Sequence, residues 1–169
     1  MISFECNCCG ETHEGLPDLA FQLPEVIFEI DLEERDKRCS ISTDLCTLDD
    51  EYFFIRGLLE LPIVGVDERF AYGVWSTLSR ENFDLYSSTF DQDIQSNLGP
   101  FFGYLSNGIP GYENSLNLHV DVQPRDHGDR PSFGLHDQGH PLCDTQKNGL
   151  SRDEVIARVE AVLHPSSAV

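Results

Sequence analysis

The sequence predicts an α+β protein with an antiparallel sheet and two main helices, opened by a Cys-rich N-terminal segment. Three observations lead to this fold class. Segments with alternating apolar residues outnumber segments with helical spacing, the strand-like segments follow one another directly, and a Cys-rich turn begins the chain. The 169 residues contain no repeat and no long linker, so we expect a single domain over residues 1–169, with residues 1–17 packed on it.

The first half of the chain contains the clearest strand pattern. Residues 26–30 are expected to be extended, and the charged residues 32–38 to form a short exposed helical turn. Residues 52–63 alternate in hydrophobicity and predict a strand that is closed by Pro62 and Gly65. The expected core face of this strand consists of Phe53, Ile55, Leu59 and Leu61.

Residues 69–78 predict the second strand of a hairpin, followed by a helix over residues 79–95. One face of the strand is expected to carry Phe70, Tyr72, Val74 and Leu78, with Trp75 on the opposite face. Ser79 is a good N-cap for the helix, and large apolar residues recur along it at helical spacing. These residues are Phe83, Tyr86, Phe90 and Ile94.

The second half of the chain predicts three more strands and a closing helix. The strands are expected at residues 101–105, 115–122 and 131–136, the last of them at the edge of the sheet. Ser151 and Glu154 form a capping box, which indicates that a helix begins there. Its expected buried stripe consists of Val155, Val159 and Val162.

The charge of the chain restricts its partners. Eleven Lys and Arg against thirty Asp and Glu give a net charge of −19. A field of this sign repels phosphate backbones and anionic lipid, so we expect no nucleic acid and no membrane surface as partners, but a basic protein. The acidic residues expected to bind it are Glu29, Asp31, Glu33, Glu34, Asp36, Asp49, Asp50 and Glu51. The alternative is an acidic surface that serves solubility alone.

The start of the chain indicates where the protein resides. It has no basic segment followed by an apolar one, and no apolar run approaches the ~20 residues of a membrane span, so we expect a cytoplasmic protein. In a reducing compartment, the six cysteines are expected to be metal ligands or core thiols rather than disulfides.

The most specific chemical motif is Cys6-x2-Cys9-x3-His13 in a Gly-containing turn. This spacing lets two thiolates and one imidazole converge on a tetrahedral ion, as in a zinc knuckle. A closed structural zinc site needs a fourth ligand, for which we expect Cys46, because it directly precedes the clearest strand; Cys8 and Cys39 are the alternatives. Reduced surface thiols without a metal are the other interpretation of this turn.

Several further sequence features resemble one bacterial family. They include the N-terminal motif with Gly10, residues 15–17 (Gly-Leu-Pro), residues 42–46 (Ser-x-Asp-Leu-Cys) and residues 53–57 (Phe-Phe-Ile-Arg-Gly). Residues 73–83, 103–105, 110–112 and 116–118 continue the same pattern. From Phe4 to about Leu142 the chain thus resembles the family named domain of unknown function 2199, with Cys8 as an addition inside the Cys-x2-Cys motif. The resemblance implies a family and no activity.

Two classes of function follow from these observations. The first is an acidic, non-enzymatic protein-binding module with a structural zinc site, of which an immunity protein that neutralises a basic, nuclease-type bacterial toxin is the sharpest form. The alternative is a small, hydrolase-like zinc enzyme that uses Cys6, Cys9 and His13. A weaker candidate site combines His119 and Asp121 with later His and Asp residues. No recognised catalytic motif is present, so we assign no catalytic residue.

Overall fold

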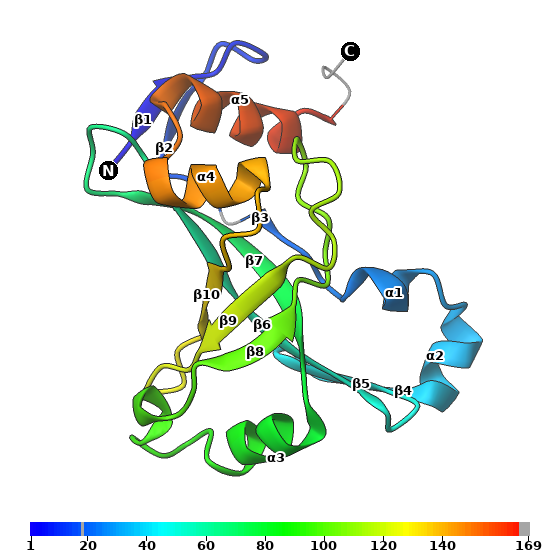
Figure 1. Cartoon of the computed structure of the whole chain (residues 1–169). Helices are drawn as coiled ribbons and strands as arrows, with labels where there is room; N and C mark the ends of the chain where they lie inside the picture. The colour runs from blue at the N-terminus through cyan, green and yellow to red at the C-terminus, as the bar shows by residue number, and fades with distance from the viewer. Residues whose placement is uncertain (18, 166–169) are drawn as a thin grey trace.

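Two long antiparallel strands form the centre of the fold in the computed structural model, which describes residues 1–17 and 19–165. β6 (Tyr52–Pro62) and β7 (Arg69–Leu78) pair from Phe53 opposite Leu78 to Pro62 opposite Arg69 (Figure 1). Their alternating pattern is confirmed, because the predicted core residues of both strands are buried and all but Phe53 lie in the main core cluster, whereas Trp75 lies in a second cluster on the other face.

The sheet continues from β6 through β10 (Ser132–Leu135), β9 (His119–Gln123) and β8 (Phe101–Tyr104). Leu105 then forms a bridge with Ser76 of β7, so the five strands curl into an incomplete barrel. The α+β class is confirmed, but the prediction of an antiparallel sheet is wrong in part. β10 is parallel to β6, and β3 (Leu19–Ala20) is parallel to β7. β10 also lies between two strands rather than at an edge.

Two glycines permit this curvature. A Cβ atom on Gly103 of β8 would lie 2.2 Å from both Oγ of Ser76 and the carbonyl oxygen of Thr77, so only glycine lets β8 approach β7 closely. A Cβ atom on Gly57 would lie 2.3 Å from the ring of Phe133, which crosses β6 at this point. At both positions, atoms of a neighbouring strand occupy the space that a Cβ atom would need.

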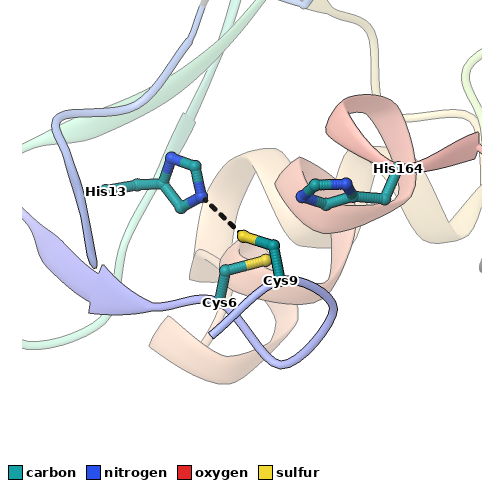
Figure 2. Close-up of side chains that lie close together, drawn as sticks. All are labelled: Cys6, Cys9, His13 and His164. Carbon is teal, nitrogen blue, oxygen red and sulfur yellow. Dashed lines mark hydrogen bonds between the residues drawn. The ribbon is translucent and has the colours of Figure 1, made fainter. Parts of the chain in front are cut away.

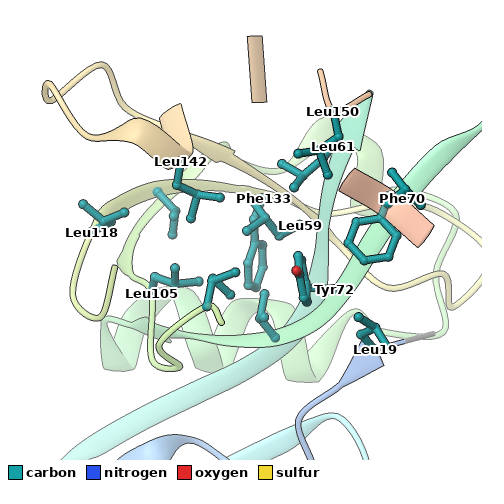
Figure 3. Packing of buried hydrophobic residues seen from close by; sticks show 14 of the residues in the cluster. Leu19, Leu59, Leu61, Phe70, Tyr72, Leu105, Leu118, Phe133, Leu142 and Leu150 are labelled. Carbon is teal, nitrogen blue, oxygen red and sulfur yellow. The ribbon is translucent and has the colours of Figure 1, made fainter. Parts of the chain in front are cut away.

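The main core fills the barrel and the space beneath the C-terminal helices (Figure 3). It includes Leu59, Leu61, Leu105 and Phe133 from the strands, and Leu142 from a helix that covers one end. Each of these five side chains is at most 2% exposed. The strands thus bury the apolar face that their alternation predicts.

A projecting arm is built from α1 (Glu25–Phe28), α2 (Leu32–Arg38), β4 (Cys39–Ile41) and β5 (Leu45–Leu48), as Figure 1 shows. The second core cluster lies beneath it and consists of Ile27, Cys46, Leu48, Phe54 and Trp75. The predicted turn over residues 32–38 is confirmed as α2. The extended segment expected at residues 26–30 is wrong, because it forms α1 and the turn after it, and Ile27 is buried in this cluster.

α3 (Arg80–Ser88) begins at its predicted N-cap, where Oγ of Ser79 accepts a hydrogen bond from the backbone of Asn82. It ends earlier than predicted. The hydroxyls of Ser87, Ser88 and Thr89 donate to carbonyl oxygens of the preceding turn, which is the local competition that makes such residues poor helix formers. A separate 3-10 turn, η1 (Gln95–Asn97), lies at the predicted end of the helix.

The C-terminal part adds α4 (Pro141–Asn148) and α5 (Arg152–Leu163), next to the hairpin of β1 (Ser3–Glu5) and β2 (Thr12–Glu14) in Figure 1. The capping box at Ser151 is confirmed, but Val162 of the predicted buried stripe is 53% exposed. With α4, the structure has more than the two expected helices. None of the helices in the described part of the chain has the length and apolar character needed to cross a bilayer.

Candidate metal centre

The N-terminal hairpin places three of the predicted ligands. β1 and β2 pair with Phe4 opposite His13, and the turn between them carries Cys6 and Cys9. The turn closes through two backbone hydrogen bonds, from Cys6 N–H to the Glu11 carbonyl at 2.9 Å and from Gly10 N–H to the Cys6 carbonyl at 2.8 Å. Gly10 has a φ of +75°, a conformation that glycine adopts without strain. The local sequence therefore presents two sulfurs and one imidazole on the same side.

The fourth member of the group is His164, which lies at the C-cap of α5 and comes from the other end of the chain. Its backbone N–H donates to the carbonyl of Glu160 at 2.8 Å, which continues the last helical turn. Figure 2 shows its imidazole facing the two sulfurs from the side opposite His13. No sequence motif pointed to His164; its position directly after an amphipathic helix was the only local signal.

Cys6, Cys9, His13 and His164 form a compact group that could hold a metal ion. One ligand atom from each of them lies within 4.8 Å of all the others. Sγ of Cys9 and Nε2 of His13 are 3.6 Å apart (Figure 2). Cys6 is buried, both histidines are half-buried and Cys9 is exposed. The group is therefore attached to the core on one side and open to solvent on the other.

The distance between Cys9 and His13 matches tetrahedral coordination. An ion bound at about 2.3 Å to sulfur and about 2.0 Å to nitrogen separates a sulfur from a nitrogen by roughly 3.6 Å. The distance from Cys9 to His13 has this value already. The remaining ligand atoms lie at most 4.8 Å apart, so pairs at the upper end of this range would have to approach one another to bind an ion.

Two further observations concern the ligand atoms themselves. Nε2 of His164 is buried and makes no hydrogen bond within residues 1–17 and 19–165, an arrangement that leaves this nitrogen available to a metal. A hydrogen bond with the Glu11 backbone lowers the pKa of the Cys9 thiol. Loss of solvation and the adjacent Cys6 together raise this pKa by more, so the thiol has a pKa above its ordinary value. A cation between the two sulfurs would stabilise both thiolates and offset the repulsion between their negative charges.

The surrounding residues hold the hairpin against α5. Oε1 of Glu160 accepts hydrogen bonds from the backbone N–H of Asn7 at 2.6 Å and from its side-chain amide at 3.1 Å. Nη2 of Arg152, at the start of the same helix, donates to the carbonyl of Ser3. The ring of Phe4 stacks on His13 with centroids 5.4 Å apart. These contacts orient the turn that carries Cys6 and Cys9.

Cys46, the fourth ligand expected from the sequence, is not part of this group. It lies on β5 opposite Phe54, fully buried in the second core cluster with Trp75 and Ile27. Burial raises the pKa of its thiol to about 12, which opposes formation of the thiolate that a metal requires. The position next to a core strand indeed determines its direction, but that direction is toward the arm and not toward the N-terminal turn.

The alternative thiols lie outside the group as well. Cys8 is exposed in the N-terminal turn, and Cys39 begins β4 and packs partly against the second core cluster. The weaker His and Asp candidates do meet in part, because Nε2 of His136 lies 2.7 Å from Oδ1 of Asp121. His119 contacts His136 ring to ring on the same surface, and no other metal-competent group was found among the described residues.

The eight predicted partner-binding acids are all exposed, on the arm and in the turn between β5 and β6. Four of them are paired within the protein. Lys37 binds Glu33 at 3.0 Å and Glu34 at 3.2 Å, Arg38 binds Asp49 at 2.7 Å, and Arg80 binds Asp50 at 3.3 Å. The ion pairs of the described residues do not include Glu29, Asp31, Asp36 and Glu51. These pairs reduce the negative charge that the arm presents.

Comparison with known proteins gives a family assignment. Neither the curated proteins nor the solved structures contained a match to the chain. A family match covers residues 5–150, a range that includes Cys6, Cys9 and His13 and ends before α5 and His164. The resemblance found in the sequence is thereby confirmed, and the chain belongs to the bacterial family described as "uncharacterized protein conserved in bacteria (DUF2199)".

Proposed function

We propose that this protein is a non-enzymatic binding module for a basic protein, stabilised by a structural zinc ion on Cys6, Cys9, His13 and His164. The observation that supports zinc is the set of four ligand atoms within 4.8 Å of one another. Two thiolates and two imidazoles are a donor set typical of structural zinc, which binds four protein ligands in a closed tetrahedron. In this proposal the ion fastens the N-terminal hairpin to the C-terminal helix.

The zinc proposal has a direct test. Protein purified without chelator is expected to contain about one zinc per chain by elemental analysis, and the variant with both Cys6→Ser and Cys9→Ser is expected to contain none. The matched control is Cys39→Ser, which removes a thiol outside the group. Wild-type protein without metal after incubation with zinc, or equal metal content in the double variant, would contradict the proposal.

The observation that supports partner binding is a pocket of about 390 Å³ where α1 meets β6 and β8. Tyr52 and Tyr104 line it and are 51% and 42% exposed, and Glu25 and Glu29 provide carboxylates at the same place. Exposed apolar surface with a charged rim is typical of a protein interface. Aromatic faces beside carboxylates favour the guanidinium or ammonium group of a basic partner.

An immunity protein that neutralises a cationic nuclease toxin is the specific partner model that we propose for this surface. The net charge of −19 would accelerate encounter with a basic protein, and the pocket would provide a particular point of contact. The test uses a fluorescently labelled hexa-arginine peptide as the probe and measures affinity at low and at moderate salt.

Two variants with the same change in charge distinguish the pocket from the general field. Glu29→Gln lies at the pocket, whereas Glu14→Gln lies on β2 in the N-terminal hairpin. We expect Glu29→Gln to weaken peptide binding several-fold more than Glu14→Gln, in line with the larger effect of a short-range charge. Equal effects of the two variants would mean that only net charge attracts the peptide, and the proposed interface would be wrong.

The enzyme alternative is less favoured by the geometry. A catalytic zinc keeps one position open for water, and His164 would fill that position here. A pocket of about 300 Å³ lies along the same helix, but none of the four ligand residues lines it. Its lining residues are Phe4, Glu5, Asn7, Arg152, Asp153, Ile156, Ala157 and Glu160.

A further inference from the structure

A larger pocket, of about 520 Å³, lies between α5 and the strands beneath it. Its size falls in the range of about 300 to 1,000 Å³ that small-molecule sites occupy in proteins. Most of the lining is apolar, from Leu19 of β3, Tyr72 of β7, and Ala157, Ala161 and Val162 of α5. The small alanines leave room along the helix, and an apolar ligand body would contact surface that is otherwise exposed to water.

Arg158 places one positive charge in this mostly apolar lining. Arg158 is the only basic side chain among the described residues that line the pocket. Its Nη1 donates to the carbonyl of Pro110 at 3.1 Å, its Nη2 donates to the hydroxyl of Tyr112 at 3.2 Å, and its guanidinium lies 4.8 Å from the centre of the Tyr112 ring. The guanidinium is therefore held in one place before any ligand arrives.

The hydrogen-bonding capacity of Arg158 is only partly used. A guanidinium has five N–H donors; the contacts with Pro110 and Tyr112 use two of them, and a weaker interaction with Tyr72 involves a third. Its Nε is buried and has no acceptor in the described part of the chain. Burial raises the pKa of the nearby Tyr72, and the positive charge of Arg158 partly offsets that effect, so the two groups are electrostatically linked.

The carboxylate that also lines the pocket is engaged elsewhere. Oε2 of Glu154 accepts hydrogen bonds from the backbone N–H and the hydroxyl of Ser151, at 2.8 and 2.7 Å, in the capping box of α5. These bonds turn the carboxylate toward the N-terminus of the helix, and no ion pair joins it to Arg158 among the described residues. The hydrogen bonds from Ser151 and, to a smaller extent, the positive charge of Arg158 lower the pKa of Glu154, so the two charges interact at a distance without forming an ion pair.

We propose that this pocket binds a small monocarboxylate with an apolar body, such as a medium-chain fatty acid. The carboxylate would pair with Arg158, whose planar guanidinium matches carboxylate geometry, and the apolar body would lie along Ala157, Ala161 and Val162. A single cation balances a single negative charge, and the net charge of −19 disfavours ligands with more. This proposal is independent of the metal centre and of the basic partner.

The test is an isothermal titration calorimetry experiment in which the full-length protein is titrated with decanoate below its critical micelle concentration. Decan-1-ol and decyltrimethylammonium have the same apolar chain with a neutral and a positive head, respectively. We expect saturable binding of decanoate, and affinities for the other two that are roughly tenfold or more lower, because a hydrogen bond to a charged group contributes about 1.5–3 kcal/mol. Equal binding of decan-1-ol, or no saturable binding of decanoate, would overturn the proposal.

Three variants locate the site. Arg158→Gln should weaken decanoate binding roughly ten- to hundredfold, whereas Arg69→Gln, with the same loss of charge at an exposed position of β7 outside the pocket, should leave it unchanged. Ala161→Phe places an aromatic ring in the pocket and should abolish decanoate binding. Because Ala161 is exposed, this variant tests the site independently of whether Arg158→Gln folds. Decanoate binding that survives Ala161→Phe with wild-type affinity would refute this location.

Discussion

His164 provides the sharpest test of how a metal would stabilise this fold. Cys6, Cys9 and His13 lie within eight residues of sequence, so an unfolded chain can bind a zinc ion through these three without forming a long loop. His164 is separated from Cys6 by roughly 160 residues. In the folded protein α5 already holds it beside the other three. In the proposed zinc site, the ion would therefore discriminate between the folded and unfolded states mainly through His164.

The size of this effect follows from the length of that loop. Closing a loop of about 160 residues costs about 5 kcal/mol of chain entropy at 25 °C. An unfolded chain would either incur this cost or bind without the fourth ligand, so the folded state would bind zinc more tightly by up to about 5 kcal/mol. For a chain of this size that corresponds to an increase in Tm of up to roughly 10–20 °C.

His164→Ala should therefore separate metal binding from metal-dependent stability. We expect this variant still to bind zinc through its remaining ligands, but to gain only a small fraction of the wild-type increase in Tm. The measurement is thermal unfolding by circular dichroism, with and without one equivalent of zinc, together with elemental analysis. His119→Ala, which removes an exposed imidazole from β9, is the matched control and should keep the full increase.

Two results would refute this reasoning. One is a zinc-dependent increase in Tm of His164→Ala that equals that of the wild type, because His164 would then not be a ligand. The other is loss of the zinc-dependent increase in Tm in Cys46→Ala, since Cys46 lies in the second core cluster and outside the group. The comparison uses the zinc-dependent difference within each variant, so a general loss of stability from the cavity at Cys46 does not affect it.

Three further predictions concern the fold. Ser151→Ala removes the capping box with Glu154 and should lower the free energy of unfolding by about 0.5–2 kcal/mol in urea denaturation. Gly103→Ala forces a Cβ against β7 and should cost about 1–3 kcal/mol or more, whereas Gly134→Ala, with nothing within 4 Å, should cost far less; equal losses would contradict the close approach of the two strands. Hydrogen bonds from a serine hydroxyl and backbone lower the pKa of Asp126 below 3.8, so its stabilisation is present above that pH and is lost as the pH falls through the native pKa. The difference in unfolding free energy between wild type and Asp126→Asn should accordingly shrink from about pH 6 toward about pH 3, and a difference independent of pH would contradict this origin.

Local patterns accounted for the elements whose periodicity matches their burial. The strands around Phe53 and Phe70 have one face in the main core and the other against Trp75, so alternation alone identified them. The capping box at Ser151 identified the start of α5 in the same way, because the hydrogen bonds of a cap connect residues three positions apart. In these cases the physical cause lies within a few residues of sequence.

Elements that depend on distant contacts were not predictable in this way. Residues 26–30 have apolar residues that suit a strand, but the second core cluster accepts Ile27 from a helical turn. β10 has the pattern of an edge strand, and its parallel pairing with β6 depends on where the chain returns after β9. Phe90 and Ile94 continue a helical spacing, yet the hydroxyls of Ser87, Ser88 and Thr89 end α3 before them.

The sequence by itself determined the family, the acidic character and three members of the candidate metal group, because a Cys-x2-Cys-x3-His segment can converge on one ion without the rest of the chain. The tertiary structure alone decided the fourth member of the group. Cys46 points into the core of the arm, and α5 brings His164 from the opposite end of the chain to the hairpin. The direction of a side chain on a distant element is set by how strands and helices pack against one another, and sequence spacing contains no information about that packing.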